Sequence, residues 1–235
     1  MAPSLAPETT TVLAEDHASG DPSLAFIHDE TSAPPTFVDK HEERKYLKHR
    51  LALAFRVFAK FGFAEGVAGH ITVRDPVDPT SFWVNPFGMH FSLIRDEDLI
   101  RVDHAGRVVD GGKNRRLNYG VVLASEEGKH ISKALGHKKA ALLGNHGLLT
   151  AGPSIEATVA WFVLLDKCCE VQLAADASAA GSGEPLIRIG EAESQSTWEA
   201  LGHGSGGYFM GLPLFQVAEQ DFGEMSFLGR GLEPL

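Results

Sequence analysis

The chain has 235 residues, a formal charge of -10 at pH 7 and an ordinary hydrophobic content of 43%. This length allows one sizeable domain with a real core, and the acidic balance argues against nucleic acid as a partner, because phosphate binding needs clustered Lys and Arg. No apolar run approaches the roughly 20 residues of a membrane span, and the start lacks a secretory signal pattern, so a cytoplasmic location is expected.

The acidic charge is concentrated at the N-terminus. Residues 1–39 contain seven Asp and Glu but no Lys or Arg, and they are rich in Ala, Pro, Ser and Thr. Such a composition offers too little apolar surface to offset the entropy of ordering the chain. We therefore expect residues 1–38 to form a disordered acidic leader.

A helix is predicted from Lys40 onward. Apolar residues recur there at helical spacing, charged residues occupy the intervening positions, and Gly62 follows the last turn as a stop. The pattern indicates an amphipathic helix. Its recurring apolar residues are Leu47, Leu51, Ala54, Phe55 and Phe58.

Short strands follow this helix. A turn containing Gly66 and Gly69 precedes the alternating residues 71–74, which predict a strand. Residues 82–84 predict a second strand, which ends at the turn Asn85-Pro86-Phe87-Gly88.

A hairpin predicted over residues 99–110 leads into a basic loop. Two glycines are followed there by Lys113, Arg115 and Arg116. Three positive charges beside two glycines can hold an anion, but a run of this kind is also typical of a solvated turn. The sequence leaves both interpretations open.

The second half of the chain alternates helices with short apolar runs. Helices are predicted over residues 125–135 and from residue 154 to about 177, and the middle of the second helix, residues 159–165, is apolar all round and expected to be buried. Its adjacent Cys168 and Cys169 are expected to be buried thiols without a disulfide. Residues 179–183 are predicted to be a small-residue break and 202–207 a flexible loop, followed by apolar pieces at 208–210 and 212–217. This alternation favours an α/β layered domain.

The stretch from residue 138 to 152 stands out within this half. Two apolar runs, each suited to a buried strand, are broken by Gly144-Asn145-His146-Gly147. An imidazole at such a kink suits a metal ligand or an acid-base group. It can equally cap a hairpin, because Asn and Gly are turn-forming residues.

The order of these segments resembles the class II aldolase/adducin family. The resemblance rests on the helix from Lys40, residues 65–74, residues 85–88, and above all residues 145–152 with the helix that follows. It covers most of residues 40–178, and residues 179–235 resemble the C-terminal extension of fungal-type members. One domain over residues 39–235 is therefore expected.

The resemblance implies a three-layer α/β/α sandwich and an aldolase-type lyase, as in fuculose-phosphate aldolase. Such enzymes cleave a carbon–carbon bond of a hydroxy-carbonyl substrate with a divalent metal, commonly zinc, which stabilises the enediolate as it forms. Three imidazoles usually hold the metal, two from a His-x-His pair and one from the Asn-His-Gly segment. The third ligand would be His146 in this chain.

The resemblance also assigns turns that hold the anionic group of the substrate. They match residues 69–72 and 85–88, but His70 stands where Asn is expected and Phe87 where a serine would offer its hydroxyl. A phosphorylated substrate is therefore not expected. The predicted substrate-binding residues are Gly69, His70, Thr72, Asn85 and Gly88.

The chain also departs from the family by an absence. None of its eleven histidines forms a His-x-His pair. The helix, the paired histidines and the catalytic acid of the family should fall between Asn118 and Tyr119, where this chain runs straight on. An incomplete central sheet is therefore expected, and the catalytic residue stays unassigned. A site rebuilt from His70, His90 and His146 is a further alternative.

Three functions remain open at this point. The chain can be a metal-dependent aldolase acting on a small hydroxy-carbonyl substrate. It can be a catalytically silent, adducin-like protein with an assembly role or a cytoskeletal partner such as actin. It can also be a truncated isoform. The resemblance further implies a homo-oligomer.

Overall fold

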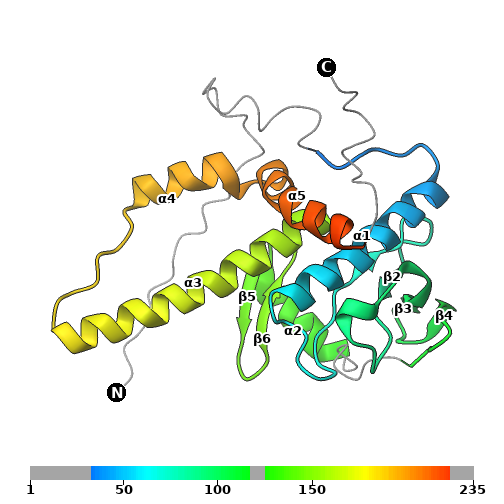
Figure 1. Cartoon of the computed structure of the whole chain (residues 1–235), viewed down its shortest axis with the longest axis horizontal. Coiled ribbons are helices and arrows are strands. Elements are labelled where there is room, and N and C mark those ends of the chain that lie inside the picture. The colour runs from blue at the N-terminus through cyan, green and yellow to red at the C-terminus, as the bar shows by residue number, and fades with distance from the viewer. Residues whose placement is uncertain (1–32, 117–124, 223–235) are drawn as a thin grey trace.

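The computed structural model describes residues 33–116 and 125–222 (Figure 1). In order along the chain, the first group of elements is α1 (Lys40–Lys60), β1 (Val73–Arg74), β2 (Ser81–Val84), the 3-10 turns η3 (Phe91–Leu93) and η4 (Asp96–Asp98), β3 (Ile100–Asp103) and β4 (Val108–Gly111). The second group is α2 (Ser125–Leu135), β5 (Ala140–Leu143), β6 (Gly147–Thr150), α3 (Ile155–Ser182), α4 (Glu191–Thr197), the π-helical turn η5 (Trp198–Gly202) and α5 (Gly204–Asp221). The expected leader lies almost entirely outside the described residues, as does the Asn118–Tyr119 junction.

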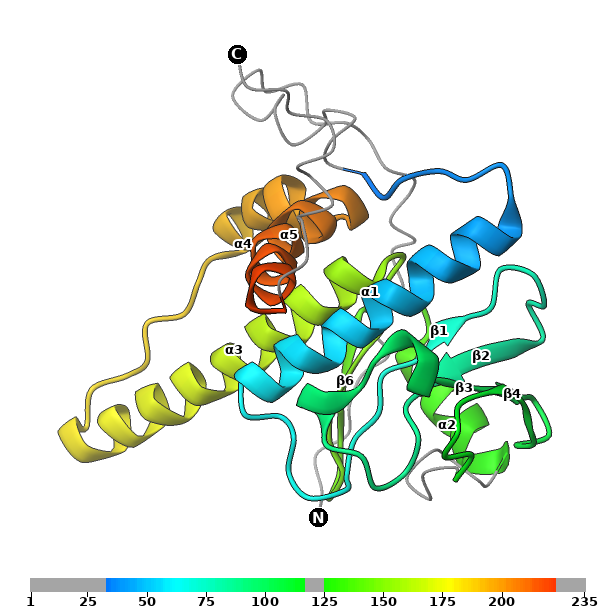
Figure 2. The same cartoon turned by 45° about the vertical axis from the view of Figure 1, so that its right-hand side comes forward.

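The strands of the described residues fall into two separate antiparallel sheets (Figure 2). One has the order β1-β2-β3-β4, with Trp83 paired to Val73 on one side and to Arg101 on the other. The second is the hairpin β5-β6, with Leu142 paired to Leu148. This division agrees with the expected incomplete central sheet. The mixture of helices and sheets confirms the α/β class.

The hairpin is less buried than its apolar sequence predicted. Leu142 is 68% exposed, and no residue of β5 or β6 is buried. The hairpin packs against α3 and has contacts with α2, but no further strand pairs with it in the described part of the chain. An apolar run therefore indicated strands correctly but did not indicate what would cover them.

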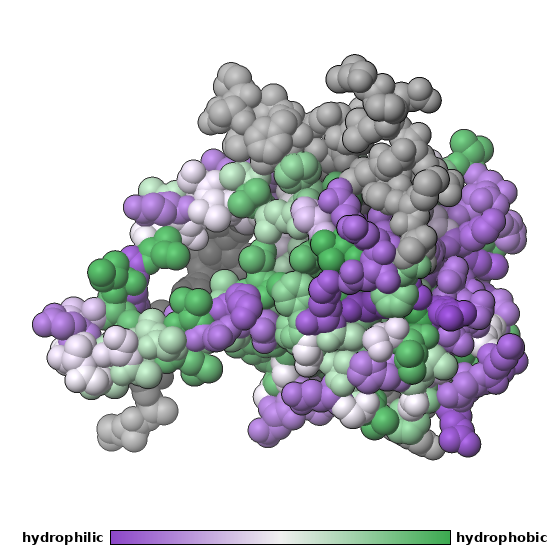
Figure 3. Space-filling model, in the orientation of Figure 1, coloured by the Kyte–Doolittle hydropathy of each residue, from purple (hydrophilic) through white to green (hydrophobic). Residues whose placement is uncertain are grey.

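Helix α3 is longer and more exposed than predicted. It ends at Ser182, and Gly183 caps it in the left-handed conformation with φ 74°. Val159 is buried, but Leu164 is 43% exposed and Cys168 is also exposed. The far half of the helix extends away from the sheets, and Figure 3 shows green, hydrophobic side chains on the surface of this projecting part. The two cysteines are free, as predicted, but they are not buried.

The predicted glycine loop at 202–207 is wrong, because α5 begins at Gly204. The His203 side chain caps this helix by accepting a hydrogen bond from the Gly206 N–H at 3.1 Å. Helix α5 packs closely along α3: a methyl group at Gly207 would lie 2.6 Å from the Trp161 ring, and one at Gly211 would lie 2.5 Å from the carbonyl oxygen of Glu156. Gly207 and Gly211 therefore serve the close approach of two helices, and the late apolar pieces belong to one helix.

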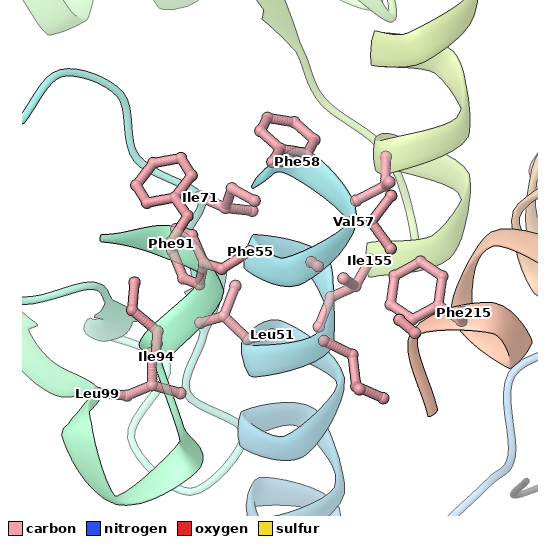
Figure 4. Packing of buried hydrophobic residues seen from close by; sticks show 14 of the residues in the cluster. Leu51, Phe55, Val57, Phe58, Ile71, Phe91, Ile94, Leu99, Ile155 and Phe215 are labelled. Atoms are coloured by element: carbon pink, nitrogen blue, oxygen red, sulfur yellow. The ribbon is translucent and has the colours of Figure 1, made fainter. Parts of the chain in front are cut away.

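Helix α1 is central to the hydrophobic core. Asp39 caps it by accepting a hydrogen bond from the His41 N–H at 2.8 Å. Figure 4 shows the side chains of this helix between two groups of partners, with Phe91, Ile94 and Leu99 on one side and Ile155 and Phe215 of α3 and α5 on the other. The middle of α1 is consequently buried almost all round, where the sequence had indicated a single apolar face.

A buried ionic network joins the three principal helices. Arg50 of α1 donates from Nε to Glu156 of α3 at 2.6 Å and from Nη1 to Glu219 of α5. All three residues are at least 97% buried. The hydrogen-bonded Tyr46 and Tyr208 lie beside the network, and burial together with the negative charge of Glu156 raises the pKa of both phenols. No helix within the described residues is long and apolar enough to cross a membrane.

We expect Arg50→Met to lower the free energy of unfolding by about 3–5 kcal/mol, because it leaves two buried carboxylates without their cation. The matched control is Lys60→Gln. It removes the exposed pair of Lys60 and Asp221, which also joins α1 to α5, at 2.7 Å, and should cost less than about 1 kcal/mol. Urea unfolding of both variants measures the difference. An equal loss of unfolding free energy in the two variants would show that burial does not make the Arg50 network more important for stability than the exposed pair.

Asp75 gives the fold an acid-sensitive contact. Burial alone would raise the pKa of this carboxyl, but hydrogen bonds from Arg44 at 2.7 Å, from the backbone N–H of Asp78 and from the Trp83 indole at 2.6 Å outweigh it and lower the pKa to about 2. A depressed folded-state pKa stabilises the protein above the unfolded value of 3.8, and the stabilisation is lost as the pH falls toward about 2.

We expect the unfolding free energy of the wild-type protein to fall by about 2 kcal/mol more than that of Asp75→Asn between pH 5 and pH 2. Urea titrations at half-unit pH steps measure this. Parallel pH profiles for the two proteins would contradict the assignment.

Candidate functional site

His146 lies at the tip of the β5-β6 hairpin. The turn is closed by the His146 N–H, which donates to the carbonyl oxygen of Leu143 at 3.0 Å. Asn145 adopts a left-handed conformation with φ 60°, which Asn tolerates better than most residues. The His146 side chain is exposed. The backbone of this segment is thus the hairpin turn that the sequence allowed, and it presents the imidazole to solvent.

The first predicted substrate turn, residues 69–72, lies between α1 and β1. Gly69 has φ 84° and lies against the ring of Phe91. The His70 side chain is exposed at its surface, but neighbouring atoms desolvate the ring enough to lower its pKa. Thr72 is exposed as well.

The second predicted turn, residues 85–88, is more deeply placed. Asn85 is 98% buried, and its side-chain oxygen has no hydrogen-bond partner in the described part of the chain. Gly88 is exposed with φ 80°. The basic loop holds this turn, since the Phe87 N–H donates to the Arg116 carbonyl at 2.7 Å and Asn114 Nδ2 donates to the Phe87 carbonyl at 3.1 Å.

A cavity of about 360 Å³ lies where the start of α1, strand β1 and the start of α3 meet. Of the predicted substrate residues, Thr72 lines it. Tyr46 and Glu156 also line it, so the cavity borders the buried network. No local pattern in the sequence indicates this arrangement, because Arg50 and Glu156 are 106 positions apart.

The described residues do not fit the metal site of the family. They contain no group of three His, Cys, Asp or Glu side chains placed to share an ion. The alternative site of His70, His90 and His146 is therefore not formed, and His90 instead caps η3, with its Nδ1 2.7 Å from the hydroxyl of Ser92. The structure brings the basic loop to the second turn, but it does not gather the histidines.

Comparison with known proteins identifies the relatives of this chain. The model for the class II aldolase and adducin N-terminal domain matches residues 49–123 and 115–173. The 4-hydroxy-3-prenylphenylpyruvate oxygenase/4-hydroxy-3-prenylbenzoate synthase of Streptomyces roseochromogenus subsp. oscitans is 37% identical, with 65% of this chain and 76% of that protein covered. Rat alpha-adducin is 27% identical, with 78% and 32% covered.

A solved structure adds to these matches. The L-fuculose 1-phosphate aldolase from Glaciozyma antarctica PI12 superposes with a TM-score of 0.75 and 37% identity, covering 86% of this chain and 98% of that one. The fold of this chain is therefore the class II aldolase fold.

The same alignments extend over more positions than this chain contributes to them. The Streptomyces alignment spans 213 positions but includes 65% of 235 residues, about 153, so about 60 positions face gaps in this chain. The adducin alignment, with 245 positions and 78% of the chain, leaves about 62. The family match breaks at residues 115–123, which contain the Asn118–Tyr119 junction. The chain belongs to the class II aldolase and adducin N-terminal domain family.

Proposed function

We propose that this chain is a catalytically silent member of its family with a role in protein assembly. The observation that carries the proposal is the exposed position of His146, with no second or third ligand gathered around it in the described part of the chain. One imidazole does not bind zinc usefully, because a stable site needs three or four ligands at fixed geometry.

The gap of about 60 positions accounts for the missing partners of His146. Family chemistry uses a divalent metal, and the His-x-His pair expected between Asn118 and Tyr119 would supply two of its ligands. A protein with this fold can therefore carry out the reaction of its relatives only when that segment is present. We propose zinc as the metal of the completed site and a small hydroxy-carbonyl compound as its substrate.

We expect the purified protein to contain less than about 0.1 equivalent of divalent metal, because it offers one ligand. Insertion of the corresponding segment of the Glaciozyma antarctica aldolase between Asn118 and Tyr119 should restore about one equivalent and aldol cleavage. His146→Ala in that chimaera should remove both, whereas the exposed control His104→Ala should remove neither. Metal is measured by plasma mass spectrometry and cleavage with a panel of hydroxy-aldehydes and hydroxy-acids.

A stoichiometric metal in the uninserted protein, lost in His146→Ala together with cleavage activity, would overturn the proposal of a silent protein. A chimaera that folds but takes up no metal would overturn the role of His146 as a third ligand.

The exposed far half of α3 supports the assembly role. Val171 is 66% and Leu173 is 71% exposed, and Ile189 of the following linker is 82% exposed. Val171 and Leu173 are two positions apart on α3 and so point to different sides of the helix. Large apolar side chains exposed on a projecting segment are typical of a protein-protein interface. We propose that a second copy of the chain covers them. The likeness to alpha-adducin supports a further cytoskeletal partner such as actin, in the cytoplasm.

We expect Val171→Glu/Leu173→Glu to weaken self-association by about tenfold or more, because two charges would have to be buried at the interface. Val109→Glu, on the exposed edge strand β4, is the matched control and should leave association unchanged. Light scattering across a concentration series measures the molar mass, and co-sedimentation with actin filaments tests the cytoskeletal partner. Unchanged association in the double variant would contradict the proposed interface.

A further inference from the structure

The cavity beside the buried ionic network has a buried carboxylate in its wall. Its volume of about 360 Å³ lies at the lower end of the range for small-molecule sites. The charged residues of its lining are Glu43, Arg74 and Glu156. Glu43 forms an ion pair with Lys40, and Arg74 Nη1 donates to the Pro79 carbonyl oxygen at 2.6 Å. Glu156 differs from the other two, because it is only 2% exposed.

The network to which Glu156 belongs holds more negative than positive charge. Arg50 contacts both Glu156 and Glu219, so one guanidinium serves two carboxylates. It binds Oε1 of Glu156, and no described residue donates a hydrogen bond to the second oxygen, Oε2. Tyr46 and Tyr208 add no charge, because burial and the carboxylate of Glu156 raise the pKa of both phenols. A buried carboxylate oxygen without a donor is costly, so a further cation at the cavity would stabilise the network.

The start of α3 also lines the cavity, but it does not favour an anion there. The N-terminus of a helix attracts negative charge. In this helix the Ser154 hydroxyl accepts a hydrogen bond from the Ala157 N–H at 3.1 Å, and Glu156 itself supplies a carboxylate in the first turn. The positive end of the helix dipole is therefore already matched by a charge of the protein.

The rest of the lining is mainly aromatic and aliphatic. Phe37 and Tyr46 both line the cavity, and the centroids of their rings lie 5.1 Å apart. Leu47, Val73 and Ile155 add aliphatic side chains. Aromatic faces attract cations, and an apolar lining favours a ligand with a hydrocarbon body. The cavity thus suits an ammonium group attached to a small hydrocarbon body.

We propose that this cavity binds a small organic amine in its protonated form, with the ammonium group donating a hydrogen bond to Oε2 of Glu156 and the hydrocarbon body packed against Phe37 and Tyr46. The ammonium group supplies the positive charge that the network lacks, so that two cations face the two carboxylates of Glu156 and Glu219. A charge-assisted hydrogen bond of this kind is stronger than one between neutral groups.

This amine site differs in place and in charge from the sites that the family resemblance assigns. The described residues that line the cavity include Thr72 of the first predicted turn, but not His70, Asn85 or His146. A buried carboxylate at its wall repels an anion. The amine site needs neither a metal nor cleavage activity, so it stands apart from the proposed silent assembly role.

Isothermal titration calorimetry on the full chain tests the proposal with three probes that share one hydrocarbon body. Phenethylamine carries the ammonium group, 2-phenylethanol is its neutral counterpart and 3-phenylpropionate its anionic counterpart. We expect phenethylamine to bind at least about tenfold more tightly than either of the others. Equal binding of the amine and the alcohol, tighter binding of 3-phenylpropionate, or no binding of the amine would overturn the proposal.

Two variants of the network locate the ammonium group. Glu156→Gln should weaken the binding of phenethylamine by about tenfold or more, because the charged acceptor is lost. Glu219→Gln is the matched control, since it removes the other carboxylate from Arg50 but lies outside the described lining of the cavity, and it should leave binding within about threefold. Equal losses in the two variants would overturn the assignment to Glu156. Circular dichroism confirms that each variant is folded.

A third variant tests the place of binding without altering the buried network. Thr72→Trp puts a large side chain on the wall of the cavity at an exposed position, and should weaken the binding of phenethylamine by about tenfold or more. The same substitution at the exposed Thr80, which the described lining does not include, should leave binding within about twofold. Full affinity in Thr72→Trp would overturn the proposed location.

Discussion

The buried guanidinium of Arg50 fixes how the three principal helices meet. It reaches Glu156 in the first turn of α3 and Glu219 near the end of α5, over sequence separations of 106 and 169 residues. Buried ion pairs add little net stability compared with apolar packing, but a wrong arrangement leaves a charge without its partner and is costly. Because α3 follows strand β6 directly, this constraint also sets where the hairpin carrying His146 leaves the body of the protein.

Helix α1 explains how the fold persists although its sheets are separate. It carries Arg50 toward α3 and α5, and it also packs Leu51 and Phe55 into the core shared with Phe91 beside the first sheet. The two groups of elements are therefore joined through a helix. The exposed Leu142 is the consequence of an absent neighbour among the described residues, because a hairpin that packs on one face leaves its other face uncovered.

Local patterns in the sequence were sufficient to predict the helices and strands, but not the residues that pack against them. The spacing of Leu47 to Phe58 predicted α1, and a turn glycine predicted the hairpin of residues 99–110, whereas the hairpin around His146 was one of two interpretations that the sequence left open. The predicted burial of Cys168 was wrong, because apolar content does not reveal that a helix extends beyond the body. The predicted loop at residues 202–207 was wrong because glycine occurs both in flexible loops and where helices pack closely. For Gly207 the difference lies in its partner, Trp161 of α3, which is distant in sequence. The Arg50 network left no local trace at all.

The same distinction between local and distant contacts separates the basic loop from the metal site that the family resemblance implied. The basic loop and the turn at Phe87 come from segments on either side of β3, in one continuous sheet, and the hydrogen bonds that join them lie within the described residues. A three-histidine metal site needs ligands from segments far apart, and the two ligands of the expected His-x-His pair belong to one segment. In the proposed silent protein both are therefore missing together, whereas the positive charges beside the second predicted substrate turn lie within the described residues.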